Sequence, residues 1–126
     1  MAWQFNSSQA VFIQISDRLR RDIISGKYPP DSQMPSVRQL AFEAAVNPNT
    51  MQKALSVLES EGLLWSQGTV GRFITSDVNA LEAAREAVRR DTVKRLLAET
   101  RALGISSEEL IDYIKKEGEE NEHTCS

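Results

Sequence analysis

Asn49, Gln52 and Lys53 are two carboxamides and one ammonium group whose spacing places them on one face of a helix. A carboxamide can donate to and accept from the edge of a base, and an ammonium group binds phosphate. The opposite face of the same segment is apolar and consists of Met51, Ala54, Leu55 and Leu58. A surface helix with a solvated polar face has the same pattern, so the spacing alone leaves both interpretations open.

A second apolar stripe lies just before this segment and predicts a helix-turn-helix. Its members recur at i, i+3, i+4 and i+7, and they are Val37, Leu40, Ala41 and Ala44. Ser36 is predicted to cap this first helix, and Asn47 followed by Pro48 is predicted to begin the second. Such a pair of helices presents the N-terminus of its second helix to the DNA major groove.

Two β-prone runs follow the second helix and predict a hairpin. Residues 63–67 and 72–75 flank the glycine-containing turn 68–71, and Gly62 stands where a helix C-cap needs a left-handed residue. A hairpin in this position is a wing. Arg72 is expected at its tip, within reach of a phosphate or an adjacent minor groove.

An amphipathic helix is predicted ahead of the helix-turn-helix. Its apolar residues recur every fourth position and are Val11, Ile15, Leu19 and Ile23, and Gly26 ends it. The order helix, turn, helix, helix, hairpin predicts a winged helix-turn-helix over residues 1–75. The fold class is therefore expected to be mainly α (α+β), followed by a short C-terminal two-helix region.

The predicted DNA contacts extend beyond the second helix. Thr50 lies on the flank of that helix and is expected to contact a phosphate, whereas Arg38 can reach a phosphate or a guanine. The complete set of residues assigned to DNA binding is Ser36, Arg38, Asn47, Asn49, Thr50, Gln52, Lys53, Gly71 and Arg72.

Taken together, these segments resemble the GntR family of bacterial transcriptional regulators. The matching residues are 15–26, 35–41, 46–50, 58–63 and 71–74. The short remainder looks like the YtrA subfamily. The resemblance implies a homodimeric repressor of its own or a neighbouring operon, often one that encodes an ABC transporter. The family wing often has Gly-x-Gly before its aromatic residue, and Thr69 stands where the first glycine is common.

The C-terminal part is predicted to be a helical dimerisation region over residues 76–118. Its first helix runs to Leu103 with Gly104 after it, and a capping box at 106–109 opens the second. The apolar residues expected at the dimer interface are Leu81, Val88, Leu96, Leu103, Leu110, Ile111 and Ile114. Folding back on the winged helix is the alternative, but pairing with a second subunit is favoured because two recognition helices read an inverted-repeat operator. Residues 119–126 are expected to be a disordered acidic tail.

Charge and composition suit a cytoplasmic protein. The chain has 126 residues, one cysteine and a net charge of −3, with no membrane-length apolar run and no secretory leader. Residues 1–75 hold seven Lys or Arg against six acids, so the acidic excess lies in the C-terminal part. The aromatic residues Trp3, Phe5 and Trp65 are expected to pack against the winged-helix core.

Catalysis and metal binding are not expected. His123 and Cys125 could supply two ligands, but a structural zinc site needs four. No histidine base accompanies Ser36, and no cofactor is expected. Two alternatives to a DNA-binding regulator stay open: a winged-helix protein-interaction module without DNA readout, and a sensor whose small-molecule effector binds between the helices of the dimer.

Overall fold

The computed structural model describes residues 2–124, and the side chains of residues 2–120. The described residues form α1 (Val11–Ile24), α2 (Val37–Ala44), α3 (Pro48–Ser60), β1 (Leu64–Gln67), β2 (Gly71–Ile74), α4 (Val78–Ala102) and α5 (Ser107–Thr124). The expected fold class, mainly α with one small β hairpin, is confirmed. The chain divides into two compact units, Met1–Glu86 and Ala87–Ser126.

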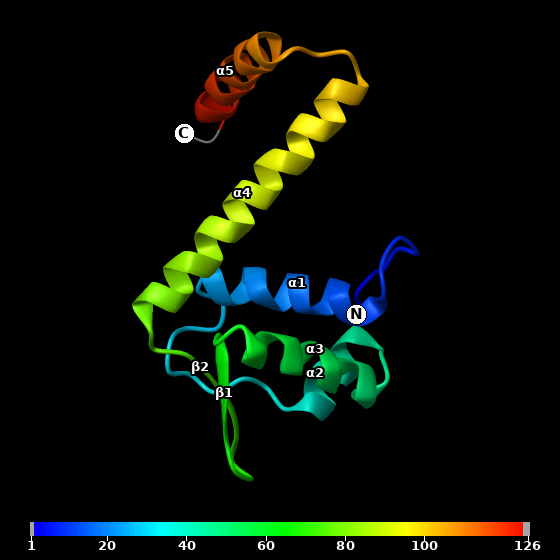
Figure 1. Cartoon of the computed structure of the whole chain (residues 1–126), viewed down its shortest axis with the longest axis vertical. Coiled ribbons are helices and arrows are strands. Elements are labelled where there is room, and N and C mark those ends of the chain that lie inside the picture. The colour runs from blue at the N-terminus through cyan, green and yellow to red at the C-terminus, as the bar shows by residue number, and fades with distance from the viewer. Residues whose placement is uncertain (1, 125–126) are drawn as a thin grey trace. The chain divides into compact units, whose positions relative to one another are not determined.

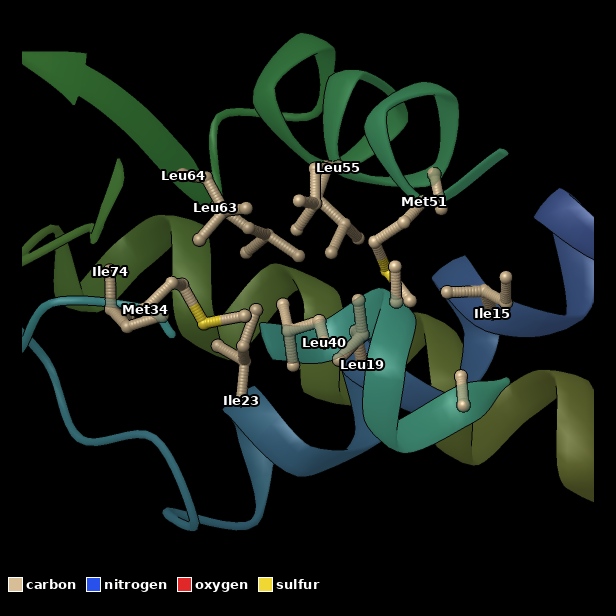
Figure 2. Close-up of a cluster of buried hydrophobic side chains, with 14 of the residues drawn as sticks. Ile15, Leu19, Ile23, Met34, Leu40, Met51, Leu55, Leu63, Leu64 and Ile74 are labelled. Carbon is tan, nitrogen blue, oxygen red and sulfur yellow. The ribbon is translucent and has the colours of Figure 1, made fainter. Parts of the chain in front are cut away.

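The core of the first unit lies between its three short helices and the base of the hairpin. Figure 2 shows the apolar side chains that meet there, with α1, α2 and α3 each contributing one stripe: Ile15, Leu19, Ile23, Leu40, Met51 and Leu55. Leu64 and Ile74 close the core from the two strands. Trp3 and Phe5 pack against this cluster as expected. Trp65 does not, because Leu64 occupies the core-facing position of β1 and the next residue must point the other way.

The predicted caps at the start of α2 and α3 are present. The Ser36 hydroxyl accepts a hydrogen bond from the Gln39 amide at 3.1 Å, and Asn47 Oδ1 accepts one from the Asn49 amide at 2.8 Å. Each bond satisfies an amide that has no partner inside its helix. The tight turn between α2 and α3 passes through Ala45, whose φ of 58° is left-handed. These caps define where α2 and α3 begin.

The hairpin is antiparallel, and its register pairs Leu64 with Ile74 and Ser66 with Arg72. The segment before α2 holds the outer edge of β2. The Met34 amide donates to the Arg72 carbonyl and the Ile74 amide donates to the Ser32 carbonyl, both at 2.9 Å. The base of the hairpin is therefore anchored, and its far end projects beyond the three helices (Figure 1).

The first unit extends farther along the chain than the predicted boundary at residue 75. Leu81 is buried in the same core and Ala84 packs against it. Arg85 Nη2 donates to the Ile24 carbonyl at the end of α1, at 3.0 Å. The assignment of Leu81 to a dimer interface is therefore wrong, since this side chain already has its apolar neighbours within its own unit.

The second unit begins within α4 and includes α5. Ser106 and Glu109 form the predicted capping box, with reciprocal bonds of 3.2 Å from the Ser106 amide to the Glu109 carboxylate and 3.1 Å from the Glu109 amide to the Ser106 hydroxyl. In this unit Leu110 and Thr100 are buried, whereas Leu103, Ile111 and Ile114 are exposed.

The expectation of a disordered tail over residues 119–126 is wrong for 119–124, which continue α5. Glutamate and lysine favour helices, and Lys115 and Lys116 stand four residues before Glu119 and Glu120. An acidic run attached to a capped helix can therefore extend that helix. Residues 125–126 lie outside the described part of the chain, and so does the side chain of His123. Among the described helices, none is long and apolar enough to cross a membrane.

Candidate nucleic-acid interface

The exposed face of α3 is polar from its first turn onward. Asn49, Gln52 and Lys53 are exposed, whereas Met51 and Leu55 on the opposite face are buried. The Asn49 and Gln52 carboxamides have no hydrogen-bond partner among the described residues. Thr50 is half-buried at the edge of this face. The first turn of α3 contains no acidic residue, so the positive end of its helix dipole is unopposed.

Two further assigned residues, Ser36 and Arg38, lie at the start of α2. Ser36 is the N-cap of α2, and its hydroxyl oxygen is already used as an acceptor within the helix. Arg38 is exposed and makes no ion pair with a described residue. Its guanidinium is therefore not used in the fold, and a group of this kind can bind a phosphate or a guanine. Asn47 has the structural role of capping α3, and its Oδ1 is engaged by the Asn49 amide.

Lys53 is placed differently from the two carboxamides. Its Nζ lies 4.1 Å from the centroid of the Phe12 ring, so the side chain turns toward the N-terminal end of α1. A cation over an aromatic face is attracted by the electron density of the ring. Phe12 thus restricts an otherwise flexible side chain at the flank of α3. Lys53 is still exposed, and the position suits a contact with the DNA backbone.

Arg72 is not at the tip of the wing. The turn at the tip is 68–70, and Arg72 is the second residue of β2. Its side chain points to the same face as Ile74 and forms an ion pair with Glu59 of α3. The Ser66 hydroxyl donates to the same carboxylate at 2.7 Å. The hydrogen bond from Ser66, together with the bond and charge of Arg72, lowers the pKa of the Glu59 carboxyl below its ordinary value of 4.5, against the opposing effect of burial.

Gly71 is required by the backbone at the start of β2. Its φ is +135°, and a Cβ atom there would lie 2.8 Å from Nε2 of Gln33. That Nε2 donates to the Val70 carbonyl at 2.8 Å and so fixes the turn. The wing and the start of α2 border a hollow of about 220 Å³, and its lining brings together three of the assigned residues, Ser36, Gly71 and Arg72.

Four residues near the interface were not found from the sequence: Phe12, Gln33, Glu59 and Ser66. Strand alternation was the signal for two of them. Because Ile74 is a core residue, Arg72 two positions earlier must face the same side, toward the end of α3. Ser66 is then its cross-strand partner, and Glu59 in the last turn of α3 is the nearest acid. The contact between Lys53 and Phe12 has no comparable sequence signal, since it joins two helices far apart in the chain.

The wing carries its own aromatic pair on the other face. The rings of Trp65 and Phe73 stack with centroids 4.9 Å apart, and Trp65 is 45% exposed. Among the described residues there is no group of three or more His, Cys, Asp or Glu side chains that could hold a metal ion.

Comparison with known sequences identifies the class of regulator to which these features belong. Residues 13–74 match the family described as "Bacterial regulatory proteins, gntR family". The chain is 29% identical to the uncharacterised regulator YhcF of Bacillus subtilis, covering 89% of this chain and 93% of that one. It is 29% identical to the repressor YtrA of the same organism over 87% of this chain and 85% of YtrA. It is 32% identical to the regulator Rv1152 of Mycobacterium tuberculosis, over 78% and 80% of the two chains.

Solved structures show the same arrangement. A GntR family transcriptional regulator from Listeria monocytogenes matches with a TM-score of 0.81 at 28% identity, covering 89% of this chain and 98% of that one. The DNA-binding domain of AraR, solved in complex with an operator, matches with a TM-score of 0.52 at 27% identity, over 57% of this chain and 93% of that domain. The relatives are transcriptional regulators and not enzymes.

Proposed function

The chain belongs to the GntR family of bacterial regulatory proteins and its YtrA subfamily, and on that premise we propose how this DNA-binding transcriptional regulator works. We propose that it is a homodimeric repressor of its own or a neighbouring operon, acting in the cytoplasm on an inverted-repeat operator. Each subunit places the N-terminal half of α3 in the major groove of one half-site.

The observation that carries this proposal is the exposed polar face of α3. The Asn49 and Gln52 carboxamides stand one helical turn apart, and neither is used in the fold. Met51 and Leu55 hold the other face of the helix in the core, so the polar face has a fixed direction. Exposed carboxamides on a helix face of fixed direction can donate and accept at once, which suits base edges.

Phosphate contacts surround this face. Arg38 is exposed at the start of α2, Thr50 lies at the edge of α3, and Lys53 is held beside Phe12 on the other flank. These positions suit residues that set the register of α3 on the DNA backbone. Arg72 is left out of this set because its guanidinium is already paired with Glu59.

Dimerisation is supported by the second unit, where Leu103, Ile111 and Ile114 are 77%, 51% and 53% exposed. An exposed group of apolar side chains in a small helical unit is typical of an association surface. A two-fold dimer carries two copies of α3, and half-sites one helical turn or a multiple of it apart suit that symmetry. A small-molecule effector, if one acts here, would bind between the helices of this dimer.

The operon is proposed on the resemblance to YtrA, a repressor in Bacillus subtilis. The resemblance implies that such an operon often encodes an ABC transporter. The alternative function, a winged-helix protein-interaction module without DNA readout, has less support because such a module needs neither the free carboxamides of α3 nor the free guanidinium of Arg38.

The test is a footprint of the full chain on the DNA upstream of its own gene, repeated at two salt concentrations. We expect protection of two symmetric half-sites, and binding that weakens as salt rises because phosphate contacts release counterions. Full-affinity protection of one asymmetric site would contradict the dimeric readout. Binding that is equal on all DNA would favour the interaction module.

A further inference from the structure

One carboxylate in the last turn of α3 holds both strands of the wing. Glu59 Oε1 accepts a hydrogen bond from the Ser66 hydroxyl of β1 at 2.7 Å and one from Arg72 Nε of β2. Ser66 and Arg72 are directly opposite each other in the hairpin. The side chains of Arg72 and Glu59 are only 16% and 31% exposed, so this contact is partly shielded from solvent.

We propose that Glu59 is a positioning residue for DNA binding, which sets the direction of the wing relative to α3, and that Arg72 is the anchor of the wing rather than a phosphate contact. The proposal rests on the proposed function, in which α3 and the wing bind the same half-site. In this role the pair acts on DNA binding by holding the wing in place, and neither residue contacts DNA.

The wing needs such an anchor because only its base is packed into the core, through Leu64 and Ile74. Its strands have four residues each, and a two-stranded hairpin alone is marginal in water. The backbone bonds to Ser32 and Met34 fix the outer edge of β2. Farther from the base, the contact of Glu59 with Ser66 and Arg72 links the hairpin to α3.

Because the wing tip is uncharged, its contribution to DNA binding depends on where it is placed. Residues 67–71 carry no charge. Such a tip has no long-range attraction to phosphates and can contribute only when its backbone and short side chains lie at hydrogen-bond distance. A small change in the angle of the hairpin therefore removes its contacts.

Glu61 provides a matched control two residues farther along the chain. Its carboxylate accepts from Arg20 Nε at 2.8 Å and from Arg20 Nη2 at 2.6 Å, which ties the end of α3 to α1. The two glutamates have similar exposure, and each forms an ion pair with one arginine of another element. Only Glu59 contacts the wing.

The experiment compares Glu59→Gln, Arg72→Gln, Glu61→Gln and the charge exchange Glu59→Arg with Arg72→Glu, all in the full chain. The probe is a duplex selected from a random pool by the wild-type chain. We expect Glu59→Gln to weaken binding by about 2- to 30-fold, the range for residues that act on a site without touching the ligand. Hydroxyl-radical protection should disappear where the wing lies and persist in the major groove. Glu61→Gln should leave affinity and footprint unchanged.

The salt dependence separates an anchor from a phosphate contact. Arg72→Gln should weaken binding without changing the slope of log K against log salt, whereas loss of a phosphate contact makes the slope shallower by about 0.9 per contact. The charge exchange should recover part of the affinity. Tighter binding or a steeper slope in Glu59→Gln would overturn the proposal, because it would mean that Glu59 withholds Arg72 from DNA. Unchanged affinity in Glu59→Gln would overturn it too, as would an equal, uniform loss of affinity in Glu59→Gln and Glu61→Gln.

A measurement without DNA keeps this proposal distinct from the proposed function. Trp65 is the neighbour of Ser66, so its fluorescence reports on the wing once Trp3 is replaced by phenylalanine. We expect acrylamide to quench Trp65 more strongly in Glu59→Gln than in wild type or Glu61→Gln. If the wild-type chain selected no duplex, the DNA-binding function would fail. Quenching alone would then decide whether Glu59 holds the wing, and equal quenching in the three proteins would overturn that role.

Discussion

The two compact units of the chain differ in whether their apolar side chains form a continuous core. In the unit of residues 1–86, Ile15 and Leu55 are at most 1% exposed and belong to a continuous core (Figure 2). In the unit of residues 87–126, Leu103 is 77% exposed, and Ile111 and Ile114 are about half exposed. The first unit thus buries a continuous core, although Phe42 and Val78 remain exposed on its surface, whereas the second unit leaves a large part of its apolar side chains to solvent.

This difference follows from what each unit contains. The first unit can surround a core from several sides, because it has three short helices, the start of α4 and a hairpin. The second unit has only two helical segments, which can share only one contact surface. Helices without enough packing are marginal in water. If the chain dimerises as we propose, the first unit should be stable by itself and the second should gain its stability from association.

The largest effect is expected when charge is introduced into the exposed apolar surface of the second unit. Ile111→Lys combined with Ile114→Lys should convert a dimer to a monomer, since two buried ammonium groups would have no partner. Loss of the second half-site contact should weaken operator binding by about 10²- to 10⁴-fold. Sedimentation velocity and a binding titration measure both quantities.

The control for that experiment is Val78→Lys. Val78 is also an exposed apolar residue, but it lies at the start of α4, within the first unit. The substitution should change neither the sedimentation coefficient nor the affinity. If the double variant of α5 remained a dimer with wild-type affinity, the apolar surface of the second unit would not be the subunit contact.

The next effect compares one leucine of each unit. Leu55→Ala removes a fully buried side chain and should lower the free energy of unfolding of the first unit by about 2–5 kcal/mol. Leu103→Ala removes an exposed one and should leave that value unchanged. Trp3 and Trp65 both lie in the first unit, so urea unfolding followed by tryptophan fluorescence reports on this unit. Equal losses in the two variants would contradict the separation of the units.

The sequence predicted the first unit well because its signals are local. Ser36, Asn47 and Pro48 act within one turn of the helices that they begin, and the apolar stripes of α1, α2 and α3 have the spacing of buried faces. The end of α5 was predicted wrongly for a related reason. Acidic residues favour both a solvated helix and a disordered tail, and composition does not separate the two.

Contacts between distant segments could not be predicted in the same way. Leu81 fits an interface stripe as well as a core stripe, and only the packing of α4 on the first unit decides between them. Arg72 was expected at the wing tip because it follows the turn 68–71. Alternation along β2 gives the face on which Arg72 lies, but its pairing with Glu59 also depends on the angle at which the hairpin leaves α3. Residue type and periodicity do not contain that angle.

An intermediate effect concerns base readout, which we propose for α3 of the first unit alone. Gln52→Ala should relax the preference at one base pair of each half-site, because a bidentate amide contact discriminates by about 1–3 kcal/mol. The side chain is exposed and leaves the core intact, so dimerisation and the unfolding midpoint should not change. Binding-site selection with wild type, Asn49→Ala and Gln52→Ala measures this effect. If both variants returned the wild-type consensus, specificity would have to come from DNA shape or from the wing.

The smallest effect is the pH dependence of the Glu59 ion pair. The hydrogen bond from Ser66 and the pairing with Arg72 lower the pKa of Glu59 in the folded chain below its ordinary value of 4.5. A group with a lowered folded pKa stabilises the fold above its unfolded pKa, and this stabilisation is lost as pH falls through the folded pKa. Wild type should therefore unfold at higher urea than Glu59→Gln at pH 7, by no more than the about 0–1 kcal/mol typical of solvent-accessible pairs. The difference should shrink as the pH is lowered below 4.5. A difference that stayed constant from pH 7 to below 4.5 would show that the loss in Glu59→Gln comes from packing and not from the charge of the carboxylate.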